Sequence, residues 1–248
     1  MILIQCLKAD FLKTKRLSLR LAHILIPIGV SAIFIAYYSY SLWTEYVKID
    51  AFYQVMGMAM PVLIGIFCAM LSEQEHTAGA FQSMLMMQKK CIPFLSKLIV
   101  LLLMGLGALL LTSVLFGAGF YLALGNRMVA LQFYFGVSFV LLGSSMILYI
   151  LHLFLAFHFN KGISIGVGIV ESLVSALFLT DMGKYAWKYV PASWSARMST
   201  TFLSAYTGNV TAAQTLHTML SVCAVSTLVA IVLFIIWASR WEGTKTVD

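Results

Sequence analysis

SEQEHTAGAFQSMLMMQKKCIPFLSK, residues 72–97, is the longest polar interruption in the first half of the sequence. Apolar runs long enough to cross a bilayer precede and follow it, so we expect it to lie outside the hydrocarbon between two membrane-spanning helices. Within it, Phe81, Met84 and Leu85 fall at helical spacing and predict a short amphipathic helix at the membrane surface. This stretch is therefore where the chain is expected to contact a soluble partner.

The composition is that of a polytopic membrane protein. Of the 248 residues, 61% are hydrophobic and 10% are charged, and the mean hydropathy is +0.95. Such a chain leaves little for a folded module outside the membrane, so we expect one all-α membrane domain over residues 1–248. The formal charge of +7 comes from basic residues in the predicted loops, where they set topology, and nucleic acid is not an expected partner. The four cysteines include no CxxC pair and predict neither a disulfide nor a metal site.

Six apolar segments are expected to span the membrane as helices, with limits set by charge and turn residues. The expected spans are residues 21–42, 51–71, 98–124, 132–159, 163–180 and 216–237.

An interfacial amphipathic helix is expected ahead of the first span, over residues 1–20. Leu3, Leu7 and Phe11 recur there at i, i+4 and i+8, while the basic residues point elsewhere. The alternative is the basic region of a signal peptide. We favour the helix because no A-x-A-like cleavage site follows the apolar run.

The basic residues predict which side of the membrane each loop occupies. With a cytoplasmic N-terminus, the inside segments carry eleven of the sixteen lysines and arginines, including Arg16 and Lys245, and the outside segments carry five, including Arg127. The positive-inside rule then places both termini and residues 72–97 in the cytoplasm, and residues 181–214 outside.

Residues 181–214 are not an ordinary polar loop, because seven large apolar or aromatic residues punctuate them: Tyr185, Trp187, Tyr189, Trp194, Phe202, Leu203 and Tyr206. Aromatic rings of this kind gather at lipid headgroups. The pattern predicts either a partly re-entrant or surface-lying pair of short helices broken at Pro191, or an external loop that rests on lipid.

Glu171 is the acidic residue that falls well inside a predicted span. A carboxylate at this depth is costly, so we expect it to face a cavity, a neighbouring helix or a protonated state, with His152 or Tyr149 as its partner. Both a pathway or gating residue and an interhelical hydrogen bond fit the pattern. In the same span, Gly162 and Gly166 predict close helix contact, and we favour packing within the monomer over a dimer interface.

The sequence carries no catalytic, cofactor-binding or metal-binding motif. GxxxxGK[ST], HExxH and GxSxG are all missing, and the five histidines form no pair at metal-binding spacing. We therefore expect a protein that is not itself an enzyme. An intramembrane enzyme is disfavoured because no span carries paired acids or a Ser/His pair.

Several segments together resemble the ABC-2 type permeases, with a type V exporter-like architecture. They are the amphipathic N-terminal helix, the six spans, the aromatic segment before the last span, and the loop pattern E-x-E-x-T-x-G-x-F-x-x-x-L. More narrowly, MILIQCLKADFLKTKRLSLRLAHILIPI, SEQEHTAGAFQSMLMM, YVPASWSAR and SRWEGTK are similar to the permease subunits of lantibiotic-immunity transporters, of the MutG kind.

The resemblance implies a set of partners and a site. The partners would be a cytosolic ABC ATPase that holds ATP and Mg, and a second permease, either a paralogue or a copy, in a dimer. The cargo would be an antimicrobial peptide expelled from the bilayer of a bacterial plasma membrane. The residues implied in coupling to the ATPase are Glu73, Glu75, Thr77, Gly79, Phe81, Met84 and Leu85.

Two alternatives stay open from the residues alone. One is an ABC-2 exporter of a lipid-linked compound, another peptide or a drug. The other is a non-transporting membrane subunit with a structural or signalling role. The first glutamates of the 72–97 stretch also fit an ordinary solvated loop, although we favour docking because an amphipathic turn follows them.

Overall fold

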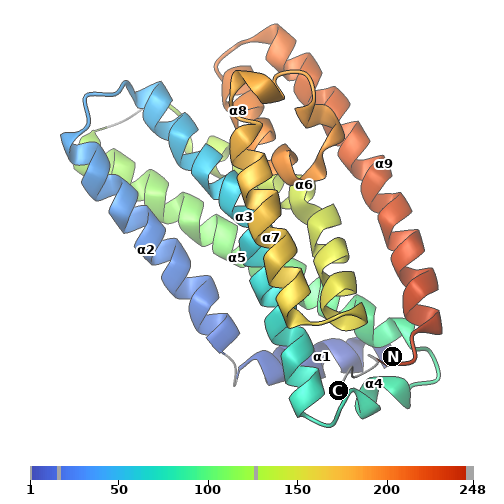
Figure 1. Ribbon diagram of the computed structural model, residues 1–248. Coiled ribbons are helices and arrows are strands. Elements are labelled where there is room, and N and C mark those ends of the chain that lie inside the picture. Colours follow the sequence, from blue (N-terminus) through green and yellow to red (C-terminus); the bar gives the residue numbers. More distant parts are fainter. Residues whose placement is uncertain (1, 16–17, 126–127, 244–248) are drawn as a thin grey trace.

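The structure is a computed structural model that describes residues 2–15, 18–125 and 128–243, and these residues form a helical bundle (Figure 1). Arg16, Arg127 and Lys245, which entered the topology prediction, lie outside the described residues. The helices are α1 (Ile2–Thr14), α2 (Ser18–Tyr40), α3 (Glu45–Thr77), α4 (Gln82–Leu85), α5 (Cys91–Leu124), α6 (Leu131–His158), α7 (Lys161–Leu177), α8 (Trp194–Tyr206) and α9 (Val210–Arg240).

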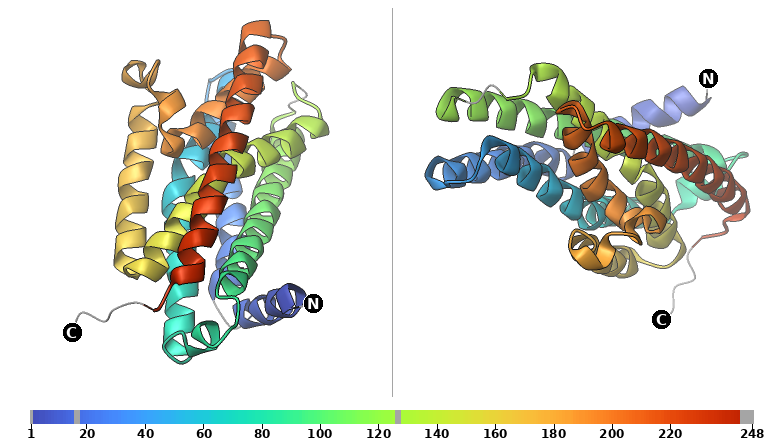
Figure 2. Two further views of the ribbon diagram at one scale, coloured as in Figure 1. Left: turned by 90° about the vertical axis from the view of Figure 1, so that its right-hand side faces the viewer. Right: turned by 90° about the horizontal axis from the view of Figure 1, so that it is seen from above.

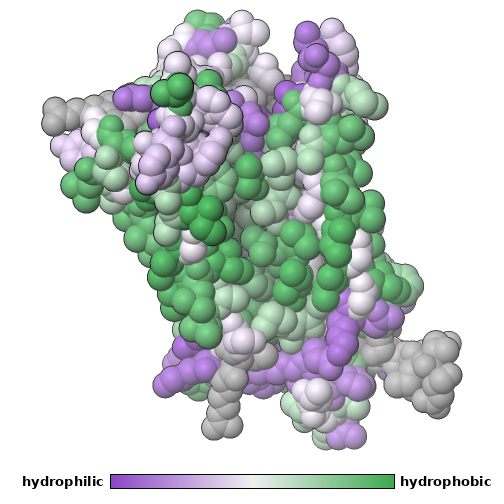
Figure 3. Space-filling view, turned by 60° about the vertical axis from the view of Figure 1, so that its left-hand side comes forward, coloured by the Kyte–Doolittle hydropathy of each residue, from purple (hydrophilic) through white to green (hydrophobic). Residues whose placement is uncertain are grey.

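Five of these helices, α2, α3, α5, α6 and α9, are long and apolar enough to cross a membrane. The sequence predicted six spans. The segment expected at 163–180 forms α7, whose 17 residues extend about 26 Å, less than the roughly 30 Å of a hydrocarbon core. On the face shown in Figure 3, hydrophobic residues form a band between two hydrophilic ends, as expected of a chain that crosses a bilayer.

The polar stretch at 72–97 is mostly helical, because the long helices on either side extend into it. α3 continues to Thr77 and α5 begins at Cys91, which leaves only residues 78–90 between the two long helices. Glu, Gln, Lys and Ser are tolerated inside helices, so their appearance marks the exit from the hydrocarbon and not the end of the helix. α3 ends at the turn that contains Gly79, whose φ of 136° favours glycine.

α3 is the central helix, and small residues let its neighbours approach closely. A Cβ at Gly57 would lie 2.4 Å from the Cα of Ala196 in α8, and one at Gly168 in α7 would lie 2.8 Å from the carbonyl oxygen of Pro61. Such close approach of two backbones is how helices pack in a membrane, where hydrophobic burial alone does not drive the association of helices. Ser195 Oγ donates to the Gly57 carbonyl at 3.1 Å and pins the first of these crossings.

Gly162 and Gly166 do not make this contact, which corrects the prediction that they pack within the monomer. Both are exposed, and an added Cβ at Gly166 would meet open space. The face of α7 that meets α3 is instead built from Ser164, Gly168 and Ser172, four residues apart. The sequence indicates that this helix has a side of small residues, and the contact with α3 uses Ser164, Gly168 and Ser172 of that set.

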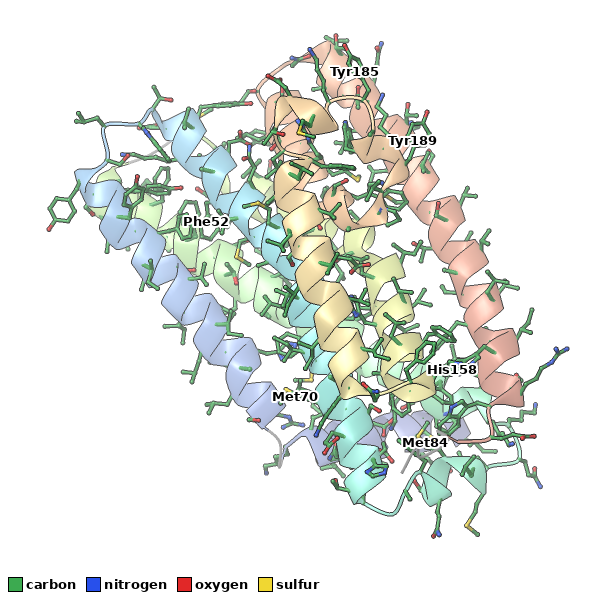
Figure 4. The ribbon with its side chains drawn as sticks, in the orientation of Figure 1. Phe52, Met70, Met84, His158, Tyr185 and Tyr189 are labelled. Carbon is green, nitrogen blue, oxygen red and sulfur yellow. The ribbon has the colours of Figure 1, made fainter. Side chains whose placement is uncertain are left out.

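The segment between α7 and α9 folds back against the bundle in three short 3-10 turns, η1 (Asp181–Gly183), η2 (Trp187–Tyr189) and η3 (Pro191–Ser193), followed by α8. Trp187 and Trp194 are buried in a cluster with residues of α6 and α9. Tyr185 and Tyr189 are exposed at the end of the molecule opposite α4 (Figure 4). Pro191 begins η3, so the break expected at this residue lies between two 3-10 turns, η2 and η3.

The first prediction concerns the crossing of α3 and α8. Gly57→Ala should destabilise the protein by about 1–3 kcal/mol, because the new methyl group meets backbone atoms that cannot move aside. The matched control is Gly143→Ala in α6, where nothing lies within 4 Å of the added Cβ. Thermal unfolding of the two variants in detergent tests the difference, and equal melting temperatures would contradict it.

Candidate functional site

A buried cluster of charged side chains joins three helices at the end of the bundle that carries α1 and α4. Lys97 of α5 is at its centre, and its Nζ donates to Asp10 Oδ1 of α1 and to Glu75 Oε1 of α3, both at 2.9 Å. The side chains of all three are at most 7% exposed. Lys13 of α1 also donates to Glu75 Oε1, at 2.7 Å, from a partly exposed position. We call Asp10, Lys13, Glu75 and Lys97 the charge cluster.

The charge cluster is electrically balanced and well supplied with hydrogen bonds. Its two carboxylates face two ammonium groups, and Ser96 Oγ donates to the second oxygen of Asp10. Partial burial, and then the nearby Asp10 carboxylate, raise the pKa of the adjacent Cys6 thiol, so this neutral group adds no charge. A buried ion pair is costly to break, because removing one partner leaves the other without compensation in a poorly solvated site.

The charge cluster holds α1 in place. Figure 2 shows α1 lying across the end of the bundle, and its inward residues include Asp10 and Thr14. Its large apolar residues, among them Ile2, Ile4 and Phe11, are exposed. The expected interfacial helix therefore ends at Thr14 and contacts the protein through polar groups, which leaves apolar side chains turned outward.

The link between α3 and α4 is a tight turn with a fixed shape. Gly79, Ala80 and Phe81 all have positive φ values, of 136°, 47° and 65°. The Phe81 amide donates to the Glu75 carbonyl, and the Ala80 amide donates to that of His76 at 2.7 Å. The turn is therefore bonded directly to the residue that joins α3 to the charge cluster.

The apolar face expected to await a partner is covered within the chain. Phe81 and Met84 are 5% and 3% exposed. The Phe81 ring lies 5.3 Å from that of Trp241 and 5.7 Å from that of Phe157, centroid to centroid. Trp241 is fixed in turn, because its Nε1 donates to the Phe157 carbonyl at 3.2 Å. Met84 lies on the short helix α4 in Figure 4.

The predicted coupling residues thus divide into two groups. Glu75, Phe81 and Met84 are buried, and Leu85 is half-buried, so these contact the bundle. Thr77 and Gly79 are exposed on the turn, and Glu73 is half-buried and pairs with Lys161 of α7 at 2.9 Å. The exposed set also includes residues that the sequence reasoning did not choose: Gln82, Ser83 and Met86.

Glu171 contacts His152 of α6, and not Tyr149. His152 Nε2 lies 2.9 Å from Glu171 Oε2, while its Nδ1 lies 3.2 Å from Ser164 Oγ. The Ser164 hydroxyl is also 3.1 Å from the Gly65 carbonyl of α3, so one chain of polar contacts joins three helices. The Glu171 side chain is 17% exposed and lines an apolar cavity.

Within the described residues, no three His, Cys, Asp or Glu side chains lie close enough together to share a metal ion. The two polar centres are therefore networks of ion pairs and hydrogen bonds. They can fix helices to one another and exchange partners when the helices move.

Comparison with known protein families matches residues 6–178 to the family described as "ABC-2 family transporter protein". The matched region includes α3, α4, α5 and α1 from residue 6 onward, and so contains the whole charge cluster. No curated protein and no solved structure matches the chain.

The charge cluster generates the second prediction. Lys97→Met should destabilise the protein by about 3–5 kcal/mol, because it leaves Asp10 buried without a cation. The charge-balanced double variant Asp10→Asn/Lys97→Met should recover much of this loss, since Glu75 then keeps Lys13. Thermal unfolding in detergent measures both.

The control for this experiment is Lys161→Met, which removes a pair whose side chains are 59% and 44% exposed. Exposed pairs contribute only about 0–1 kcal/mol, so little change is expected. A Lys97 variant as mild as the Lys161 variant would show that the cluster does not hold the helices.

Proposed function

The chain belongs to the ABC-2 family of transporter proteins, and on this basis we propose that it is the membrane-spanning permease subunit of an ABC exporter. ATP hydrolysis takes place in a separate cytosolic ATPase subunit, which binds ATP and Mg. The observation that carries the proposal beyond the family is the fixed turn between α3 and α4. It presents exposed residues to a soluble partner, and it is bonded to a buried charge cluster that reaches three helices.

Force from the ATPase enters at the exposed tip of the turn, through Thr77, Gly79 and Met86. The tip cannot yield alone, because Phe81 is packed beneath it and bonded to Glu75. A push on the tip therefore moves the end of α3, and through Lys97 it also moves α5 and α1. The predicted docking role of Glu75 becomes one of transmission, since only 2% of its side chain is exposed. Rigid movement of packed helices is the ordinary way in which such transitions proceed.

For the topology and assembly we propose the arrangement that the sequence predicts. The chain lies in a bacterial plasma membrane with both termini cytoplasmic, and α7 together with the segment up to α8 completes a sixth crossing. Residues 181–206 reach into the bilayer from outside. A second permease, either a paralogue or a copy of this chain, forms the other half of the transporter.

The cargo that we propose is a lantibiotic-type antimicrobial peptide, expelled from the membrane of the producing cell. The four segments similar to lantibiotic-immunity permeases support this assignment. An exporter of another peptide, a lipid-linked compound or a drug would share the same coupling apparatus. The identity of the cargo is therefore tested separately from the exporter function.

Purification of the full chain from its native membrane in mild detergent is the deciding experiment. An ABC ATPase should co-purify, and lantibiotic should stimulate its ATP hydrolysis. Stimulation by another class of compound would change the proposed cargo and leave the exporter function standing. If no ATPase co-purifies under conditions that preserve a known transporter, the exporter function is wrong, and the alternative of a non-transporting membrane subunit replaces it.

The third prediction separates coupling from folding. Gly79→Val should lower stimulated ATP hydrolysis at least about fivefold, because a β-branched residue at a φ of 136° distorts the tip. Gly208→Val is the matched control, since that glycine also has a positive φ, of 99°, but lies between α8 and α9 at the other end. Both variants carry similar backbone strain. Equal loss of stimulated hydrolysis in the two would mean that the tip has no special part in coupling.

A further inference from the structure

A cavity of about 630 Å³ lies between α6, α7 and α9, and residues 190–192 close one end of it. The volume is in the range of pockets that hold small molecules, a few hundred to about 1,000 Å³. The lining is almost wholly apolar, and α9 turns exposed Leu228, Val232 and Leu233 outward beside it. The cavity is therefore open to hydrophobic molecules dissolved in the bilayer.

Glu171 is the one charged residue among the described residues that line this cavity. It lies ten residues beyond Lys161, about 15 Å along α7 and so near the middle of a hydrocarbon core. With Glu171 ionised, His152 Nε2 donates to Oε2 and orients the carboxylate. Oε1 makes no hydrogen bond to any described residue, on a side chain that is 17% exposed. Glu171 thus lines the cavity and carries one acceptor atom that no described residue satisfies.

Aromatic rings line the part of the cavity nearest α4. The Phe154 and Trp237 rings are 5.1 Å apart and meet edge to face, and Phe234 stacks against Trp237 at 5.5 Å. Aromatic faces attract cations, and their edges pack well against aliphatic chains. An apolar cavity with aromatic walls and one unsatisfied carboxylate oxygen has the chemistry that recognises a hydrophobic cation.

We propose that this cavity binds a single-chain aliphatic amine, with its ammonium group on Glu171 Oε1 and its chain along the apolar and aromatic walls. The ammonium supplies the donor that Oε1 lacks, and the ion pair forms away from water, where it is stronger. The aliphatic chain of the amine takes the place of lipid tails in the cavity, and no hydrophobic contact is lost. A neutral alcohol of the same length donates only an uncharged O–H to Glu171, without an ion pair, and an anionic amphiphile is repelled by it. This site goes beyond the exporter function, because binding here requires neither an ATPase nor a second permease.

Photolabelling of the purified full chain in phosphatidylcholine nanodiscs tests the proposal. The probe is a photoreactive dodecylamine, with dodecylamine and dodecanol as competitors and mass spectrometry to locate the label. Saturable labelling is expected on peptides that contain Val170–Val174 and Leu233–Trp237, and dodecylamine should compete for it at least about tenfold better than dodecanol. Glu171→Gln should abolish that preference.

Two further variants keep the result interpretable. Leu233→Lys places a cation at an exposed position on the cavity wall without touching His152 or Glu171, and it should reduce amine labelling and spare dodecanol binding. Glu45→Gln, which alters an exposed acid in the first turn of α3 and outside the cavity, should leave labelling unchanged.

Equal competition by amine and alcohol, or labelling that Glu171→Gln and Leu233→Lys leave intact, would show that the cavity holds only lipid chains. Label located elsewhere in the chain would also overturn the site. Because no ATP or partner enters this experiment, either failure leaves the exporter function standing, and loss of the exporter function would leave the binding result intact.

Discussion

The ammonium group of Lys97, held between the carboxylates of Asp10 and Glu75, is the contact on which the organisation of this protein depends. Each of these residues comes from a different helix, and all three are nearly inaccessible to solvent. Ions in such a place are stable only while every partner stays in position. The charge cluster therefore makes the ends of α1, α3 and α5 one mechanical unit, and the short turn after α3 is attached to it through the backbone of Glu75. Whatever moves the turn moves that unit.

The second polar centre has a different character. His152 and Glu171 are joined by a single contact, and Ser164 extends it to the backbone of α3. One carboxylate oxygen is left over, in a cavity with apolar walls. The charge cluster is thus closed and saturated, whereas the Glu171 site can still accept a donor. That difference is why the first is assigned to transmission and the second to binding.

The fold was largely predictable from the sequence, because long apolar runs have few alternatives in a bilayer. The helical class follows from composition, and the observed α6 differs from its predicted limits by one residue at each end. The partner of Glu171 was one of two candidates named. The charge cluster was missed, since Lys97 was assigned to a loop and Asp10 was given no role. Residues 10, 75 and 97 are far apart in sequence, and only the packed bundle brings them together. A lysine at a helical position among apolar residues was the available signal.

Trp241 has a consequence for the order in which the protein is made. It covers Phe81 and lies close to Phe94, so the support beneath the turn comes from a residue translated after all five long helices. Lys90 donates to its carbonyl at 3.0 Å and ties the two segments further. A nascent chain can therefore insert most of its helices while the surface that we propose for the ATPase is still unsupported. Synthesis of Trp241 completes that surface, so an unfinished chain does not present it.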